Sequence, residues 1–326
     1  MSTSRRFSIT HESVFSYEQT IPGCVMLARL CPFNDRGQRL HGFGIRIDPE
    51  VVPVASDDGF GNLCHLFTIH RRHDRATLRS SAVVETTDPP ALPDRLEAVD
   101  WDRLATAARS PELWTWLAPS RFARPGPALD GFVERNNIRP GPDPLTTLLE
   151  TCGALYRSFT YAPGATTVNS EIDVILESSE GVCQDYTHVM IALARSWGIP
   201  GRYVSGYLHL EGVSGEQTPE GASHAWAEFW LPDLGWIGLD PTNNTRADHR
   251  HVRIAHGRDY DDAAPTRGAV LAGATARVTV AVIVDELDQA ASPPPRAPEP
   301  TEQPRMTGLP WHRHAVQAPA SSNADQ

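Results

Sequence analysis

The chain has 326 residues, 40% of them hydrophobic, and its 40 acidic against 29 basic residues give a net charge of −11 at pH 7. A chain of this length can bury a sizeable core and is expected to form more than one domain. The acidic balance leaves no basic stripe to neutralise phosphates and does not favour an anionic membrane, so neither nucleic acid nor a membrane is an expected partner.

The N-terminus has no apolar run of signal-peptide length, and no segment approaches the roughly 18 apolar residues of a membrane span. We therefore predict a cytoplasmic protein. All 29 basic residues are arginine, which codon bias in a GC-rich bacterial genome explains most simply. The five cysteines are odd in number and lack a paired Cys-x-x-Cys spacing, which argues against a disulfide scaffold or a zinc ribbon.

Residues 1–90 predict a β-rich N-terminal domain, because segments such as "RFSITHESVFSY" and "GNLCHLFTIH" are short, rich in β-branched and aromatic residues and separated by turn residues. A proline-marked join at 88–94 leads into residues 91–160, a linker region in which "LEAVDWDRLATAARSPELWTWLAP" and "PLTTLLETCGALYRSF" are typical of helices.

Residues 161–288 are assigned to a third region, the expected core. It begins with a loop at 161–176 and continues with a helix after residue 182 and three strands, "GRYVSGYLHL", "SHAWAEFWL" and "GWIGLDPT". "ARVTVAVIV" at 276–284 predicts one more strand. Residues 289–326 are rich in proline and lack apolar periodicity, which predicts a disordered tail; within it, "MTGLPWHRH" at 306–314 is either a short docking motif or without function.

A thiol stands at the start of the predicted helix. After "GVC", apolar residues recur at the spacing of one helical face, and Gly198 with Pro200 supplies the stop signal. A helix N-terminus carries a partial positive charge and free backbone N–H groups, which stabilise a thiolate. Cys183 therefore suits a nucleophile, although a free cysteine is also often just a small buried apolar residue.

A nucleophilic thiol needs a base, and the base needs a group that holds its tautomer. His224 opens one strand and Asp240 closes the next, so an antiparallel hairpin turning at "PDLG" brings both to the same end of the sheet. Singly, each is also explained as a structural histidine or a turn aspartate. Three tryptophans are expected either to line the rim beside them or to pack in the core, which is the commoner role of an indole: Trp226, Trp230 and Trp236.

The other histidines are weaker candidates. His188 lies five residues after Cys183 on the same helix and so points roughly away from it. Six more lie in polar, arginine-rich or tail segments and are expected to be solvated: His70, His73, His249, His251, His312 and His314.

"GVCQDYTHVMIALARSWGIPGRYVSGYL" and "ASHAWAEFWLPDLGWIGLDPTNN" resemble the catalytic core of the bacterial transglutaminase-like family, with thiol, imidazole and carboxylate in the family's order. The segments "RFSITHESVFSYEQTI", "LCPFNDRGQRL", "DDGFGNLCHLF" and "HGRDYDDAAPTRG" resemble the β-rich region and the post-catalytic segment of that family. The resemblance runs from about residue 5 to 284.

The resemblance implies an α+β fold: a papain-like core, with the helix of the thiol packed on an antiparallel sheet, preceded by the N-terminal β-rich domain. It implies that Cys183 is the nucleophile, His224 the general acid and base, and Asp240 the orienting group. The backbone N–H of Cys183 is one expected oxyanion donor, and Tyr161 or Gln184 is expected near the other. Animal transglutaminases use calcium, but no segment resembles a calcium-binding loop, so we expect neither metal nor cofactor.

The reaction class stays open between two outcomes. A thioester on Cys183 is resolved by water in a protease or amidase and by an amine in a transamidase or cross-linking enzyme. Hydrolysis of peptide or isopeptide amides is favoured because no amine site is evident, and a peptide or protein is the expected substrate. An inactive peptide-binding module is the alternative from a different class of protein.

Overall fold

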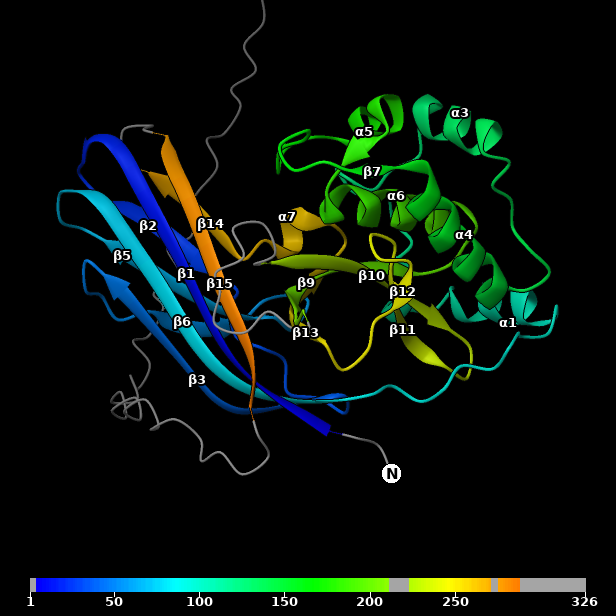
Figure 1. Ribbon diagram of the computed structural model, residues 1–326, viewed down its shortest axis with the longest axis horizontal. Helices are drawn as coiled ribbons and strands as arrows, with labels where there is room; N and C mark the ends of the chain where they lie inside the picture. The colour runs from blue at the N-terminus through cyan, green and yellow to red at the C-terminus, as the bar shows by residue number, and fades with distance from the viewer. Residues whose placement is uncertain (1–3, 211–222, 271–274, 288–326) are drawn as a thin grey trace, which may run out of the picture. The chain divides into compact units, whose positions relative to one another are not determined.

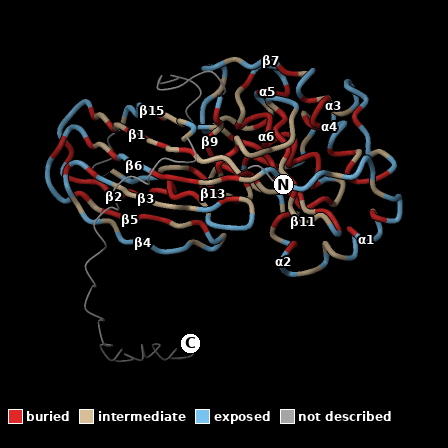
Figure 2. Tube along the Cα trace, turned by 60° about the horizontal axis from the view of Figure 1, so that its bottom comes forward, coloured by how far each residue is buried: buried red, intermediate tan, exposed pale blue. Residues whose placement is uncertain are grey.

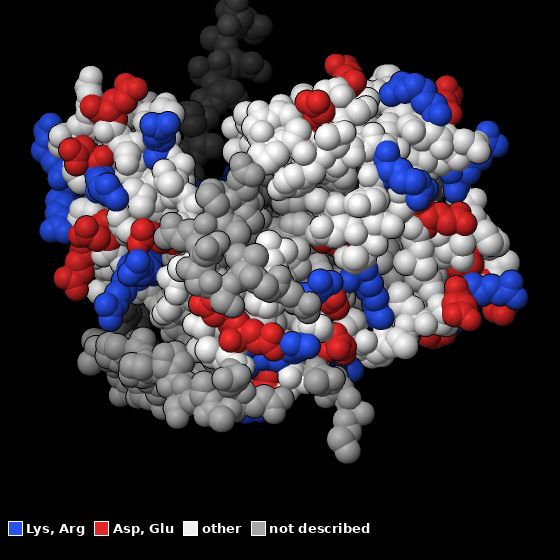
Figure 3. Space-filling model, in the orientation of Figure 1, with Lys and Arg blue, Asp and Glu red and all other residues white. Residues whose placement is uncertain are grey.

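The computed structural model describes residues 4–210, 223–270 and 275–287 (Figure 1). The predicted tail at 289–326, with its 306–314 island, lies outside the described residues. Among the residues with described structure, no helix combines the length and hydropathy needed to cross a lipid bilayer. On the face shown in Figure 3, arginine and acidic side chains lie interspersed.

The predicted β-rich character of residues 1–90 is confirmed. Two four-stranded sheets contain its strands, in the orders β15-β1-β6-β3 and β14-β2-β5-β4. The strands of this region are β1 (Ser4–Ile21), β2 (Cys24–Ala28), β3 (Gln38–Asp48), β4 (Val54–Asp57), β5 (Leu63–Ile69) and β6 (His73–Thr87). Along most of β1 every second residue is buried, because one face of the strand packs on a core and the other does not.

The last two strands correct the predicted boundaries. β14 (Thr266–Val270) pairs with β2, and β15 (Ala276–Leu287) pairs with β1 along almost its whole length. Figure 1 shows the orange β15 running beside the blue β1. Residues 266–287 therefore extend the N-terminal sheets, although the prediction assigned them to the core region at 161–288. Alternation in "ARVTVAVIV" identifies a strand but not its partner, and Val282 joins the apolar core of the N-terminal sheets.

The linker region is helical as predicted, with α1 (Asp100–Ala107), α2 (Pro111–Trp114), α3 (Pro127–Arg135) and α4 (Pro144–Ser158). The predicted loop at 161–176 is wrong in part, because it overlaps β7 (Thr160–Tyr161) and α5 (Ile172–Ser178). α5 spans only two turns, too short for a periodic signal. It is held by burial of Ile172, Ile175 and Leu176.

The core confirms the predicted packing of a helix on an antiparallel sheet. α6 (Cys183–Ser196) packs on the first two of the predicted strands, β9 (Gly201–Leu208) and β10 (His224–Leu231). β11 (Gly235–Asp240), β12 (Thr245–Arg246) and β13 (His251–Gly257) complete a sheet of order β12-β11-β10-β9-β13, and α7 (Tyr260–Ala263) follows. Gly198 ends the helix with a φ of 78°, a conformation that glycine adopts without strain.

The trace of α6 is buried over most of its length in Figure 2. Its apolar residues belong to one cluster with side chains of α4, β10 and β11. This packing fixes the start of α6 relative to the core sheet, and the thiol lies at that start.

Candidate active site

The thiol of Cys183 sits on the first residue of α6, where backbone N–H groups have no acceptor within the helix. The helix start is held by Asp185, whose Oδ2 accepts the backbone N–H of Val182 at 2.8 Å. All five cysteines fall within the described residues, and Cys183 is the one that is partly exposed. Burial raises the pKa of the other four, to about 12 for Cys31 and Cys152.

The β10–β11 hairpin brings His224 and Asp240 together, as its predicted geometry requires. Ala227 pairs with Leu239 and Trp230 with Trp236, so the start of β10 and the end of β11 share one rim. His224 Nε2 lies 2.7 Å from Asp240 Oδ2. The thiol of Cys183 lies close enough to the ring of His224 to raise the pKa of that imidazole. Because Nε2 is committed to the carboxylate, Nδ1 is the ring nitrogen left to interact with the sulfur.

The charges at this rim stabilise each other. Burial by itself would lower the pKa of His224, but the carboxylate of Asp240 and the thiolate form of Cys183 outweigh it and raise that pKa to about 10. Burial would likewise raise the pKa of Asp240, yet His224 and His251 hold it well below its usual range. At neutral pH the arrangement therefore favours a carboxylate beside an imidazolium, with the sulfur on the far side of the ring.

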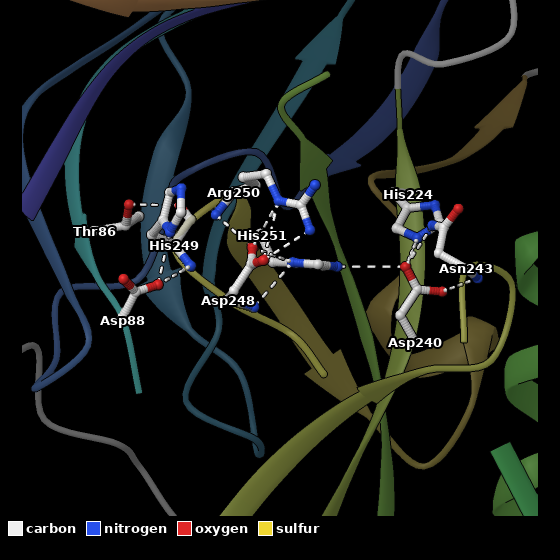
Figure 4. Close-up of polar contacts among 9 residues, drawn as sticks. All are labelled: Thr86, Asp88, His224, Asp240, Asn243, Asp248, His249, Arg250 and His251. Carbon is white, nitrogen blue, oxygen red and sulfur yellow. Dashed lines mark hydrogen bonds and ion pairs between the residues drawn. The ribbon is translucent and has the colours of Figure 1, made fainter. Parts of the chain in front are cut away.

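The carboxylate of Asp240 is fully buried and receives five hydrogen bonds. Figure 4 shows His224, Asn243 and His251 around it. Oδ1 accepts the backbone N–H groups of Thr242 at 3.0 Å and Asn243 at 3.2 Å. Oδ2 accepts from the side chain of Asn243 at 2.7 Å and from both His224 and His251. Such a set of donors compensates the loss of solvation of a buried negative charge.

His251 is the residue that the sequence interpretation missed. We expected it to be solvated, but it is 6% exposed, and its Nε2 lies 3.3 Å from Asp240 Oδ2. His73 is buried as well and contacts Cys24, so that expectation was wrong for two histidines. His312 and His314 lie outside the described residues. The alternating segment "HVRIAHG" predicts the strand that begins at His251. No pattern in the neighbouring sequence predicts that this strand lies beside Asp240.

The two residues expected near the oxyanion belong to elements next to the thiol in the structure, α6 and β7. Gln184 is buried, and its Nε2 donates to the carbonyl of Val168 at 3.2 Å, which ties the helix to the preceding loop. Tyr161 is 45% exposed and pairs in β7 with Gly181 of β8 (Glu180–Gly181), two residues before the thiol. A role for either residue as a donor stays a prediction.

The three tryptophans do not form a rim at the site, and Trp226 is buried, as the core-packing alternative predicts. Trp226 is completely buried and packs beneath His224, with ring centroids 6.3 Å apart, so it does not line an open cleft. Trp230 and Trp236 lie at the opposite end of the hairpin, roughly 20 Å along the strand from His224. There they border a surface pocket of about 340 Å³ together with Trp116. Alternation gives the face of each side chain but not whether that face is covered.

His224, Asp240 and His251 are also the group within the described residues that could hold a metal ion, since their ligand atoms lie within 4.8 Å of one another. Asp240 Oδ2 already accepts an N–H from each ring, at 2.7 and 3.3 Å, and a metal would have to replace both protons. The contacts thus fit a hydrogen-bonded group, and a metal-free reaction stays a prediction.

Comparisons with known proteins agree with this architecture. The family described as "Transglutaminase-like superfamily" matches residues 134–241, and the family described as "Bacterial transglutaminase-like N-terminal region" matches residues 7–85. A crystal structure of a candidate cysteine protease from Cytophaga hutchinsonii superposes with a TM-score of 0.69 at 20% identity, covering 90% of this chain and 94% of that one. At that identity the likeness establishes the fold.

Two relatives are similar in sequence. An uncharacterized protein of Mycobacterium tuberculosis is 30% identical over 292 residues, covering 83% of this chain and 89% of the relative. The protein-glutamine gamma-glutamyltransferase of Pseudomonas aeruginosa is 34% identical over 93 residues, which is 26% of this chain and 13% of that protein. The chain belongs to the transglutaminase-like superfamily and carries the bacterial N-terminal region of that family.

Proposed function

We propose that the protein is a cysteine-dependent acyl-transfer enzyme that acts on peptide or isopeptide amides, with hydrolysis as the favoured outcome. The observation that carries this proposal is the hydrogen-bonded pair of His224 and Asp240 beside the thiol of Cys183 at the start of α6. A raised imidazole pKa beside a buried carboxylate keeps a proton next to the sulfur, which is the state that cysteine acyl transfer uses.

The reaction balances with these groups alone. The sulfur of Cys183 attacks the amide carbon, and the C–N bond breaks as His224 Nδ1 gives its proton to the leaving nitrogen. The product is a thioester and a free amine. Water then attacks the thioester carbon while His224 takes one proton from that water. The C–S bond breaks, the carboxylic acid is released, and the proton stays on the ring of His224 beside the thiolate. The N–H of Cys183 is positioned to donate to the oxygen that becomes negative in both steps.

The test is detection of the thioester. The chain is incubated with a panel of peptide amides, and the intact mass is measured after rapid acid quenching. We expect an acyl adduct that maps to Cys183 and that is missing from the Cys183→Ala variant. Accumulation of free carboxylic acid would support hydrolysis. If peptides bind without adduct or product across the panel, the alternative of an inactive peptide-binding module replaces this proposal.

A transamidase is the second candidate. Two observations favour it: the similarity over 93 residues to a protein-glutamine gamma-glutamyltransferase, and a sequence whose 29 basic residues are all arginine. Because the chain has no lysine, an acyl group on Cys183 cannot be transferred to a side-chain amine of the enzyme itself. Codon bias explains the same composition without any functional cause.

The two candidates separate when exposed arginines are replaced by lysine. Arg109 and Arg139 are exposed, so Arg109→Lys and Arg139→Lys should change stability by less than about 0.5 kcal/mol. The double variant is incubated at high concentration with a glutamine-containing peptide. Peptide joined to lysine, dependent on Cys183, would establish amine transfer. Deamidated or cleaved peptide without lysine adducts would support hydrolysis.

We also propose a cytoplasmic location and a peptide or protein as the substrate partner.

A further inference from the structure

Asp240 lies between two imidazoles, and the proposed reaction uses one of them. His224 approaches Oδ2 at 2.7 Å and His251 approaches the same atom at 3.3 Å. In Figure 4, His251 reaches the carboxylate from the side opposite Asn243. The His251 side chain is 2% exposed, so a polar ring has been buried against a buried carboxylate. Such a ring needs a defined hydrogen-bond role.

The neighbours of His251 fix which nitrogen carries the proton. The backbone N–H of Asp248 lies 3.1 Å from Nδ1 and can only donate, so Nδ1 carries the lone pair. Asp248 Oδ1 is also 3.3 Å from Nδ1, but a proton there would point at the amide hydrogen, and this oxygen already accepts from Arg250. Nε2 therefore bears the proton and donates it to Asp240.

The ring of His251 has little freedom to turn. It packs edge-on against the fully buried Trp226, with centroids 5.1 Å apart and planes at 76°. The segment before it is held from the N-terminal sheets, since Thr86 Oγ1 donates to the carbonyl of His249 at 2.6 Å and Asp88 Oδ1 lies 2.6 Å from His249 Nδ1. Figure 4 shows Thr86 and Asp88 in contact with His249, two residues before His251, and the ring of His251 in contact with Asp240.

We propose that His251 is a positioning residue: its Nε2–H holds the rotation of the Asp240 carboxylate so that Oδ2 stays directed at His224 Nε2. The inference rests on the proposed function. A carboxylate turns about one bond, and Oδ1 is fixed by two backbone amides that follow Asp240 itself. Asn243 and His251 donate to Oδ2 from opposite sides and so leave the carboxylate one orientation. If one of these donors were removed, the carboxylate would rotate toward the other.

The test compares two substitutions of matched purpose. His251→Phe keeps a ring against Trp226 and removes the donor, while His251→Gln removes the ring and keeps an N–H near the position of Nε2. The probe is iodoacetamide, and the rate of alkylation of Cys183 is measured from pH 5 to 9, since only the thiolate reacts.

We expect His251→Phe to slow alkylation at pH 6 by roughly 10- to 100-fold, the effect of one hydrogen bond to a charged group, and His251→Gln to recover most of that loss. The deficit should change with pH, because the positioning role acts through the charge of the His224 ring. A merely structural role would instead lower the rate or the folded fraction at every pH.

Each other outcome overturns the inference. His251→Phe matching the wild type across the pH range does so, and so does His251→Gln being as slow as His251→Phe. If His251→Phe does not fold, the His251→Gln profile and the tautomer measured by ¹H–¹⁵N correlation in the wild type decide, and a proton on Nδ1 contradicts the proposal. If wild-type Cys183 reacts no faster at pH 6 than Cys183 in His224→Ala, the proposed function fails instead, whatever the His251 variants do.

Discussion

His188 is close to Cys183 along the chain and His224 is close to it in space, and the pKa values of the two rings are shifted in opposite directions. His188 is on α6 itself, fully buried, stacked on Phe122 at 5.3 Å and tilted over Tyr203 at 5.0 Å. Its Nε2 accepts the backbone N–H of Tyr260 at 3.1 Å. Burial, with a smaller effect from Arg195, lowers its pKa to about 3.

His224 is similarly desolvated, yet its pKa is raised to about 10. The difference comes from the neighbours: aromatic rings and an arginine surround His188, whereas a carboxylate with five donors faces His224. Burial by itself lowers the pKa of a histidine, and a carboxylate close to the ring reverses the direction of that shift. Closeness to the thiol in sequence therefore does not identify the base.

The largest expected effect is loss of the reacting groups. Cys183→Ala and His224→Ala should each lower kcat/KM by at least about 10³-fold, because neither the thioester nor the proton transfer remains possible. Activity is measured on whichever peptide amide forms the adduct, with circular dichroism to verify folding. A His224→Ala enzyme within tenfold of wild type would show that another group supplies the proton.

The next largest effect tests the source of the contrast. Asp240→Asn keeps the size of the side chain but removes the negative charge, so it should slow turnover roughly 10²- to 10⁴-fold through loss of tautomer control. Glu228 cannot substitute, because its carboxylate binds Arg202 at 2.5 Å and is turned to that partner. Near-normal turnover in Asp240→Asn would remove the orienting role from Asp240.

The pH dependence sharpens the comparison further. Since the pKa of His224 is about 10 in the folded protein against about 6.5 unfolded, its imidazolium contributes stability that is complete below pH 6.5 and lost as the pH rises to about 10. Thermal unfolding measured between pH 6 and 10 should show this decline in the wild type, and Asp240→Asn should lose it. The alkaline limb of kcat/KM should lie near pH 10 and move down in the same variant. An alkaline limb near pH 6.5 in the wild type would refute the assignment.

The smallest effect on activity is expected at the other histidine. His188→Phe preserves the stacking on Phe122 but leaves the N–H of Tyr260 without its acceptor, which should cost about 1–3 kcal/mol of folding stability. Turnover per folded molecule should stay within about twofold, because the ring of His188 makes no hydrogen bond with the thiol side of the site. Urea denaturation and active-site titration by iodoacetamide separate the two quantities, and a large fall in kcat at full folding would mean that His188 takes part in the reaction.

Much of the fold could be predicted because its signals are local. The α6 pattern with Gly198 after it, the alternation in residues 1–90 and the short turn between β10 and β11 each specify an element from neighbouring residues alone. The position of the turn in a hairpin also specifies which residues lie at the same end of the two strands. The sequence therefore predicts that His224 and Asp240 lie together, as the pairing of β10 with β11 confirms. α5 and the partner of β15 were not predictable in this way, since burial by distant segments decides both.

The sequence by itself therefore determined the α+β elements, the position of Cys183 at a helix start and the shared rim of His224 and Asp240. Only the tertiary structure decided that Trp226 lies beneath the site, that His251 donates to Asp240 and that the pKa of His224 is raised while that of His188 is lowered. These properties depend on desolvation and on polar groups that separate segments bring together, such as His251 of β13 beside Asp240 of β11. Local sequence patterns do not predict such contacts, because the side chains involved are distant in the chain and come together only when it folds.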